Sequence, residues 1–261
     1  MKKILLILMS LILMLAGCNT NETKKTTIKD YKSMESASIT TKDEGEEKKD
    51  MYEISVNRPN IKIKDKEEFS KIINDELNAA IDANLESTEW IKETTIEEKE
   101  LPEYARYSAY RSDIGNEVYT NENGLLSMNL NFYEYTGGAH GLYGSTQYNY
   151  DLVEEKQIEL KDLFESSLKE NGSYLDIIFN EIEKKLKEDE NEYGIDSLND
   201  YYKKGEGIIP QFFISDNKIN IYFGVYEIAS YADGEQIFEI PLEVVQDKLS
   251  TLGKVIYNIE E

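Results

Sequence analysis

The 261-residue chain carries a formal net charge of −23, from 29 Lys and Arg against 52 Asp and Glu, and it has one Cys and one His. These counts exclude a disulfide framework and a Cys/His zinc site, since each needs several such residues. The acidic balance argues against binding to nucleic acid or to anionic lipid headgroups, and it favours a cationic partner. With 40% hydrophobic residues, the chain can bury the core of one or two domains.

The N-terminus has the pattern of a lipoprotein signal peptide. Lys2 and Lys3 precede an apolar run over residues 4–16, which is too short to be a good membrane-spanning helix. The run ends in Leu15-Ala16-Gly17-Cys18, which resembles a bacterial lipobox, so we predict that the Cys18 thiol carries a diacylglyceryl anchor. The anchor would hold the mature protein on the extracellular face of the bacterial membrane. The alternative is an ordinary secretory signal peptide with a chance cysteine.

The predicted domain order is a signal peptide over residues 1–17, a flexible tether over residues 18–50, and two closely packed subdomains over residues 51–150 and 151–261. The tether is inferred from composition, because residues 19–50 are rich in Thr, Lys, Ser, Asp and Glu and show no clear apolar period. Such a segment cannot bury enough surface to offset its ordering entropy. We expect it to act as a spacer between the membrane and the folded part.

Periodicity predicts a strand and a long helix at the start of the folded part. Apolar and polar residues alternate over residues 52–56, Pro59 interrupts the alternation, and Ile61 and Ile63 resume it. Apolar residues then recur at helical spacing over residues 69–85, with charges on the opposite face. This second stretch is therefore predicted to be an amphipathic helix with one buried face.

From residue 102 to residue 151 the period changes to two. Turn signals at residues 121–124 and 137–141 divide this stretch into an antiparallel β meander. In the middle run, over residues 126–132, apolar side chains point to one face and polar side chains to the other.

The rest of the chain is predicted to contain five elements. They are a short helix at residues 161–164, a long helix at 173–190, a hairpin at 212–225, a strand at 237–240 and a closing helix at 242–249. The whole pattern predicts an α+β fold in which antiparallel sheets pack with two long amphipathic helices.

Two ordered motifs resemble a known family. The first begins Tyr135-Thr136-Gly137-Gly138-Ala139-His140-Gly141 and continues through residues 148–152 and 158–164, and the second covers residues 221–234 and leads to Ile240-Pro241. From about residue 51 onward, the chain resembles the extracellular region of RsiV-like anti-sigma factors and the non-catalytic N-terminal region of PdaC-like deacetylases. The resemblance implies a pair of α+β domains, which in RsiV-like proteins form a receptor for lysozyme.

The sequence departs from these relatives in three ways. We see no sigma-binding cytoplasmic segment and no membrane-spanning helix, so we expect no signalling of the RsiV type. We see no polysaccharide-deacetylase domain after the motifs, so we expect no deacetylase activity and predict that the chain is not an enzyme. Ser230 stands where related loops often have Pro before the Tyr, a difference that bears on the rigidity of the loop.

Gly137, Gly138, His140 and Gly141 are predicted to form a structural turn. A catalytic His140 would need a nucleophile and an orienting carboxylate beside it, whereas the glycines fit a tight turn with positive φ. Two acidic stretches have oxygen ligands suited to calcium, but they lack EF-hand spacing and match ordinary turns. These stretches are Asp216-Asn217 and Asp233-Gly234-Glu235. We therefore predict no catalytic residue, no metal and no cofactor.

The loop from Tyr226 to Glu235 is the predicted partner-binding surface. Tyrosine suits strand packing, but it is also enriched in recognition surfaces, and this loop lies between two predicted strands. Tyr226 and Tyr231 would act as aromatic anchors, while Asp233 and Glu235 would supply complementary charge. In the alternative, both tyrosines pack inward and fix the loop.

Two functions of different classes remain. The first is a surface-anchored, non-catalytic binding module that captures lysozyme or a similar cationic wall hydrolase. The second is an envelope-maintenance module that binds wall glycan or an envelope protein without contacting lysozyme. A hydrolase with paired carboxylates is a weaker option, because acidic residues are so numerous that their spacing is uninformative.

Overall fold

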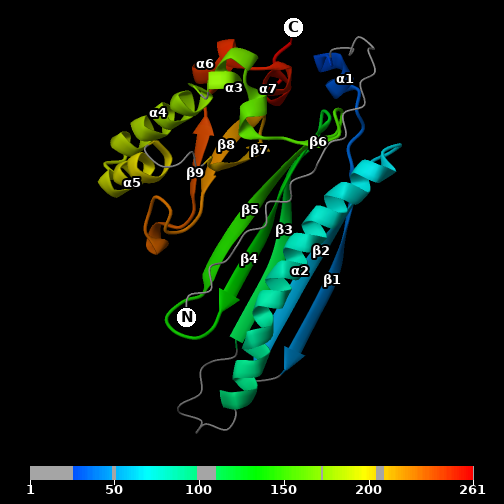
Figure 1. Cartoon of the computed structure of the whole chain (residues 1–261), viewed down its shortest axis with the longest axis vertical. Coiled ribbons are helices and arrows are strands. Elements are labelled where there is room, and N and C mark those ends of the chain that lie inside the picture. Colours follow the sequence, from blue (N-terminus) through cyan, green and yellow to red (C-terminus); the bar gives the residue numbers. More distant parts are fainter. Residues whose placement is uncertain (1–25, 49–50, 99–109, 172, 204–208, 261) are drawn as a thin grey trace.

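A computed structural model describes residues 26–48, 51–98, 110–171, 173–203 and 209–260. It shows a six-stranded sheet, a three-stranded sheet and helices packed around them, which confirms the predicted α+β class (Figure 1). The predicted signal peptide and the predicted lipidation site, Cys18, lie outside the described residues. Among the helices that are described, none is long and apolar enough to cross a membrane.

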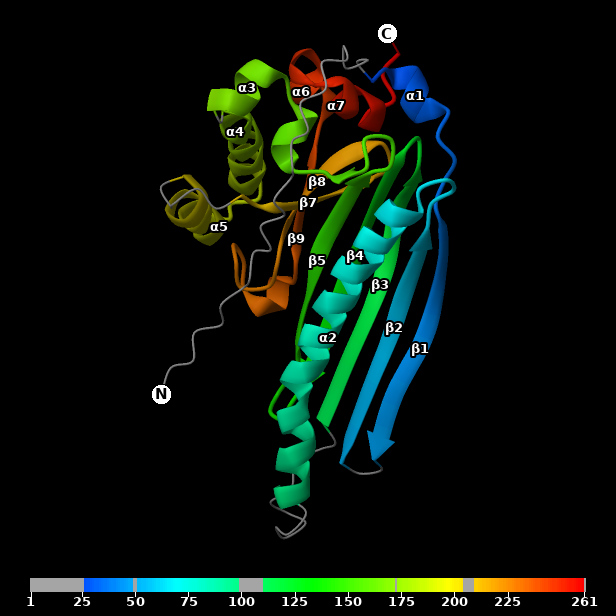
Figure 2. The ribbon, with the colours of Figure 1, turned by 45° about the vertical axis from the view of Figure 1, so that its right-hand side comes forward.

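The six strands of the first sheet follow one another in chain order, and only the second and third strands are parallel. They are β1 (Ser38–Lys48), β2 (Tyr52–Lys62), β3 (Tyr110–Glu122), β4 (Leu125–Tyr135), β5 (Leu142–Asp151) and β6 (Lys156–Gln157). A parallel pair needs a crossover connection. Helix α2 (Glu67–Glu98) lies within this crossover and runs along one face of the sheet (Figure 2).

Helix α2 is stabilised by one apolar stripe that the sheet covers. Ile73, Leu77 and Ile81 lie four residues apart, are fully buried, and share a core with Leu126 and Met128 of β4. These contacts confirm the predicted amphipathic helix and the apolar face of the predicted meander.

The helix extends beyond residue 85, where the predicted stretch ended. Its continuation is stabilised by a second small core, in which Ile91 is buried with Tyr52, Ile54 and Tyr110 from β2 and β3. The apolar period of this last part is weak, so the sequence pattern alone did not extend the helix.

The predicted flexible tether is wrong over residues 26–48. Helix α1 (Ile28–Lys32) buries Ile28 and Tyr31, and β1 pairs with β2 along its whole length. Most β1 side chains are exposed, because β1 is an edge strand held by backbone hydrogen bonds to β2. Backbone pairing of an exposed strand leaves no mark on amino-acid composition, and for this reason the composition of the segment was typical of a spacer.

Pro59 does not interrupt β2, contrary to the predicted break. Strand β3 pairs with β2 only from Tyr52 to Val56, so at Pro59 the only paired neighbour is β1. A proline is tolerated in a strand where no second neighbour needs its missing N–H.

The predicted meander is confirmed from residue 110 to residue 151 as β3, β4 and β5, and residues 102–109 of the predicted stretch lie outside the described residues. Asn123 and Gly124 form the first turn with φ values of 49° and 67°, in the left-handed region that Asn and Gly adopt most readily. Strand β6 pairs with the end of β5, so the first sheet extends past residue 151, where the second subdomain was predicted to begin.

The second sheet is antiparallel and carries its own helices. Its strands are β7 (Gln211–Ser215), β8 (Lys218–Phe223) and β9 (Gln236–Ile240). The α-helices are α3 (Ser166–Asn171), α4 (Ser173–Glu188), α5 (Glu192–Ser197), α6 (Leu242–Val245) and α7 (Thr251–Ile256). The connections contain three 3-10 helices, η2 (Leu160–Leu163), η4 (Tyr231–Asp233) and η5 (Gln246–Lys248), and a π-helix, η3 (Leu198–Lys203). The predicted long helix, hairpin and last strand are confirmed, whereas α7 was not predicted.

The two sheets are joined through the polar face of the meander. Ile214 N donates to Ser127 Oγ at 2.9 Å, Asn149 Nδ2 donates to Phe212 O at 2.7 Å, and Thr120 Oγ1 donates to Ile214 O at 2.7 Å. Side chains of the first sheet therefore bond the backbone of β7, as a neighbouring strand would. The polar side of the predicted alternation is an interface, and this interface fixes the second sheet against the first.

Candidate functional site

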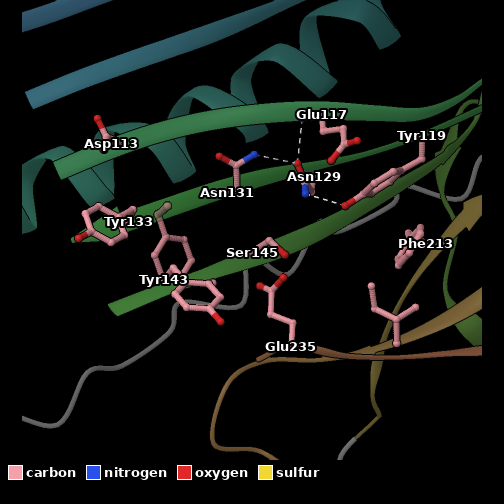
Figure 3. Close-up of a pocket in the computed structure, with 13 residues that line it drawn as sticks. Asp113, Glu117, Tyr119, Asn129, Asn131, Tyr133, Tyr143, Ser145, Phe213 and Glu235 are labelled. Carbon is pink, nitrogen blue, oxygen red and sulfur yellow. Dashed lines mark hydrogen bonds between the residues drawn. The ribbon is translucent and has the colours of Figure 1, made fainter. Parts of the chain in front are cut away.

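A groove of about 430 Å³ lies beside this interface, between the meander and the β7–β9 sheet (Figure 3). It is lined by aromatic, amide and acidic side chains from both sheets, and no Lys, Arg or His is among the lining residues. The lining residues are Asp113, Glu117, Tyr119, Asn129, Asn131, Phe132, Tyr133, Tyr143, Gly144, Ser145, Phe213, Glu235 and Ile237.

Hydrogen bonds fix the groove wall formed by β3 and β4. Asn129 Oδ1 accepts from Glu117 N at 2.9 Å, and Asn129 Nδ2 donates to the Tyr119 hydroxyl at 2.7 Å (Figure 3). The Tyr119 ring stacks on Phe213 of β7, with ring centroids 4.3 Å apart. Since Phe213 comes from the second sheet, this stack continues the wall from one half of the molecule to the other.

The three carboxylates of the groove have different surroundings. Asp113 accepts hydrogen bonds from the Ser55 hydroxyl and from Arg111, so its charge is already paired. Glu235 accepts from the Tyr222 hydroxyl, which is a neutral donor. Glu117 is exposed on β3, and within the described residues neither Glu117 nor Glu235 forms an ion pair.

The charges of Glu117 and Glu235 both influence the Tyr119 hydroxyl. Burial raises the pKa of Tyr119 to about 12, and the charges of Glu117 and Glu235 act in the same direction. Both carboxylates therefore act on one point in the groove, although they come from different halves of the chain. Tyr119 remains a neutral hydrogen-bonding group at physiological pH.

An aromatic cluster borders the groove at Tyr143, and we define it as His140, Tyr143, Tyr226 and Tyr231. The His140 and Tyr231 rings stack with centroids 3.9 Å apart, and Tyr143 and Tyr226 contact Tyr231 at 5.5 Å and 5.6 Å. The Tyr231 hydroxyl donates to Gly141 O at 2.6 Å. The two motifs that resemble the known family thus meet at one place in the fold.

The structure divides the predicted partner-binding residues among three places. Tyr226 is 55% exposed, whereas Tyr231 is partly buried and bonded to the Gly-rich turn. Asp233 accepts from the backbone and hydroxyl of Ser230 and so caps η4. Glu235 lines the groove. Their role in partner binding stays a prediction.

A capping pair fixes the loop at Ser230. Ser230 N and Ser230 Oγ both donate to Asp233 Oδ2, at 3.1 Å and 2.6 Å. A proline would have no N–H to donate, so this loop is fixed by a capping pair in place of a rigid ring.

The predicted glycine turn has two kinds of structural requirement. Gly137 and Gly138 both have φ values of 95°, which favour glycine. A Cβ at Gly141 would lie 2.5 Å from the Tyr133 ring, so close packing explains this glycine. Within the described ranges, no group of three or more His, Cys, Asp or Glu is placed to hold a metal ion.

The groove residues were missed by the sequence interpretation, apart from Glu235. The period of two placed Tyr119 and Asn129 on strands, but it gave no sign that β7 would cover part of that face. The available signal was the run of Ser and Asn on the polar face of the predicted middle strand, because side chains with both donors and acceptors suit an interface with another backbone.

The fold and the groove define the class of protein, a two-part α+β module whose recessed surface is shared by both parts. Residues 45–143 match the family described as deacetylase PdaC, and residues 161–243 match the protein family of unknown function DUF3298. These matches support a PdaC-like two-domain protein.

Known relatives cover the chain to different extents. Peptidoglycan-N-acetylmuramic acid deacetylase PdaC of Bacillus subtilis is 28% identical over 130 residues, which are 48% of this chain and 26% of that protein. The match thus spans about a quarter of the length of this curated relative. Crystal structures of DUF3298-family proteins from Bacteroides fragilis and Pseudomonas aeruginosa share the fold, with TM-scores of 0.62 and 0.54 and identities of 23% and 16%. Each alignment covers 84% of this chain and 96% of the other.

Proposed function

We propose that the chain is a non-catalytic binding module of the bacterial cell envelope that captures a cationic protein, such as lysozyme or a similar wall hydrolase. The observation that carries the proposal is an aromatic cluster beside a groove with three carboxylates and no basic residue in its lining. A basic and partly apolar protein surface would complement both features. The net charge of −23 would also steer such a partner toward the module.

The envelope location is supported by sequence. The curated relative carries a name that states its substrate, peptidoglycan, and the Cys18 lipobox would place this chain near the same layer. The resemblance to RsiV-like receptors supports lysozyme as the partner. The proposal therefore combines a lipid anchor at Cys18 with a partner-binding surface around Tyr226 and Tyr231.

Tyr226 is the residue at which the proposed partner-binding surface is tested most directly. Its φ of 68° lies in the left-handed region that tyrosine rarely adopts, and its ring is mostly exposed. Tyr226→Ala removes the ring and leaves an L-residue at the same backbone position. We expect the affinity for hen lysozyme to fall by about 2 kcal/mol, as for an exposed aromatic anchor, with an unchanged melting temperature.

The matched control is Ile72→Ala, since Ile72 is 48% exposed on α2. Calorimetric titration of lysozyme into the parent and both variants gives the comparison. Equal affinity of all three proteins would remove Tyr226 from the binding surface. An equal loss of lysozyme affinity in Tyr226→Ala and Ile72→Ala would show that the effect is not specific to the proposed surface.

The alternative function is an envelope-maintenance module that binds wall glycan or an envelope protein. Aromatic rings with hydrogen-bonding side chains also suit sugars, and the groove offers Tyr133, Tyr143 and Asn131. Two separate titrations of the purified chain, one with soluble muropeptides and one with lysozyme, test it. Binding of muropeptides without lysozyme binding would favour the alternative, and release of reducing ends during the titration would contradict the non-catalytic proposal.

A further inference from the structure

We infer that the groove is a binding site for an arginine side chain presented by the partner protein. The inference rests on the proposed function, in which the partner is cationic, and it names the contact that the groove would make. It assigns the groove a role separate from that of the aromatic cluster, which would cover the apolar part of the same partner.

The charge of the groove is the first argument. Asp113 is paired with Arg111, whereas Glu235, within the part of the chain that the structure describes, accepts only from the neutral Tyr222 hydroxyl. Glu117 adds a second unpaired carboxylate from β3, and both act on Tyr119. A partly enclosed site with two uncompensated carboxylates is stabilised when a cation enters it.

The shape of the groove favours guanidinium over ammonium. The stacked Tyr119 and Phe213 rings form one wall, and the Tyr133 and Tyr143 rings lie farther along the same groove (Figure 3). A guanidinium group is planar, stacks on aromatic faces and donates to two acceptors at once. The lysine ammonium is more strongly hydrated and cannot make such a planar contact.

The size and the remaining polar groups also fit this ligand. A volume of about 430 Å³ is in the range of sites for small ligands and can hold one long side chain with its aliphatic stem. Asn131 and Ser145 provide further oxygen acceptors near Glu117 and Glu235. A neutral sugar could donate hydroxyl hydrogen bonds to the carboxylates but would leave both charges uncompensated, and an anionic ligand would be repelled by them.

The test uses a short peptide, acetyl-Gly-Arg-Gly-amide, and its citrulline counterpart. Citrulline has nearly the same shape but no charge, so it separates the guanidinium from the stem. We expect the arginine peptide to shift the backbone NMR signals of Glu117 and Ser145, and the citrulline peptide to bind at least ~10-fold more weakly. Equal shifts with both peptides would overturn the inference.

The matched variants are Glu117→Gln with Glu235→Gln and, as a control, Glu122→Gln with Glu243→Gln. Both pairs remove two charges, but Glu122 and Glu243 are exposed outside the groove. The groove pair should weaken arginine-peptide binding by ~10-fold or more, and the control pair by less than about twofold. Equal weakening by the two pairs would show only a general charge effect and would overturn the inference.

Lysozyme binding by the same variants separates this inference from the proposed function. If the parent binds lysozyme and both variant pairs lose the same affinity, the groove inference fails and the proposed function stands. If the arginine peptide binds in the groove and lysozyme does not bind, the proposed partner is wrong and the assignment of the groove to a guanidinium ligand stands.

Discussion

Tyrosine hydroxyls serve as carboxylate partners in this acidic chain. Tyr31 donates to Asp151 at 2.6 Å, Tyr150 donates to Glu76 at 2.9 Å, and Tyr222 donates to Glu235. With 52 acidic and 29 basic side chains, there are too few cations to pair every carboxylate. Tyrosine combines an apolar ring with a neutral donor, so it can bury area and satisfy an acid at the same time. Tyr31, Tyr150 and Tyr222 therefore pair carboxylates in addition to packing their rings.

Glu76 gives a prediction on pH dependence. Burial raises the pKa of the Glu76 carboxyl, while its hydrogen bond from Tyr150 acts in the opposite direction. A raised folded-state pKa means that folding disfavours the ionised form, so stability is lost as the pH rises through that pKa. Glu76→Gln removes the charge and keeps an oxygen that can accept from Tyr150.

The expected result is that Glu76→Gln melts at a higher temperature than the parent at neutral pH, with a difference that shrinks toward about pH 4. Thermal melts at several pH values measure it, and Glu86→Gln on the exposed part of the same helix is the control. A lower melting temperature of Glu76→Gln at neutral pH would contradict the assignment.

At the scale of elements, periodicity predicted those with a buried face. Helix α2 and the meander were predicted because Ile73, Leu77 and Leu126 follow the helical or strand period. Strand β1 was missed because its side chains are mostly exposed and backbone pairing holds it. The position of β7 was missed for a related reason, since Ser127 and Asn149 bond its backbone through side chains. Sequence periodicity predicts which side chains are buried, but it does not predict hydrogen bonds between segments that are distant in the chain.

The order in residues 26–48 gives a prediction on proteolysis. Limited digestion should leave Ser38–Lys48 attached to the folded body, because β1 is paired along its whole length and α1 is fixed by the Tyr31–Asp151 bond. Mass spectrometry of the stable fragment gives its N-terminus. A fragment that begins near residue 50 would contradict the position of β1.

Tyr31→Phe refines this experiment, because it removes the hydroxyl and leaves Asp151, among the described residues, with the backbone donors of Val153 and Glu154. Losing a hydrogen bond to a buried carboxylate should cost about 1.5–3 kcal/mol of unfolding free energy. Cleavage between residues 26 and 37 should become faster, while β1 remains protected. Denaturant unfolding measures the loss of stability, and the digestion measures the cleavage rate. If both are unchanged, the Tyr31–Asp151 hydrogen bond does not stabilise this segment.

At the scale of the whole molecule, the candidate site exists only in the assembled fold. Glu117 belongs to the first sheet, and Glu235 directly precedes β9 of the second sheet. The interface between the meander and β7 brings both residues to one groove. The sequence supplied the acidic charge, the motif turn and the Tyr226–Glu235 loop. It could not supply the groove, because no pattern along the chain relates Tyr119 to Phe213. The partner is therefore proposed from a surface that neither half forms alone.

The most direct measurement is the affinity of the purified chain for hen lysozyme as a function of salt concentration. We predict one-to-one binding that weakens steadily as salt rises and persists at physiological ionic strength, because charge steers the partner while the aromatic cluster holds it. A cationic protein of similar charge and unrelated surface should bind much more weakly. Absence of lysozyme binding at low salt, or equal binding of the two cationic proteins at every salt concentration, would contradict the proposed function.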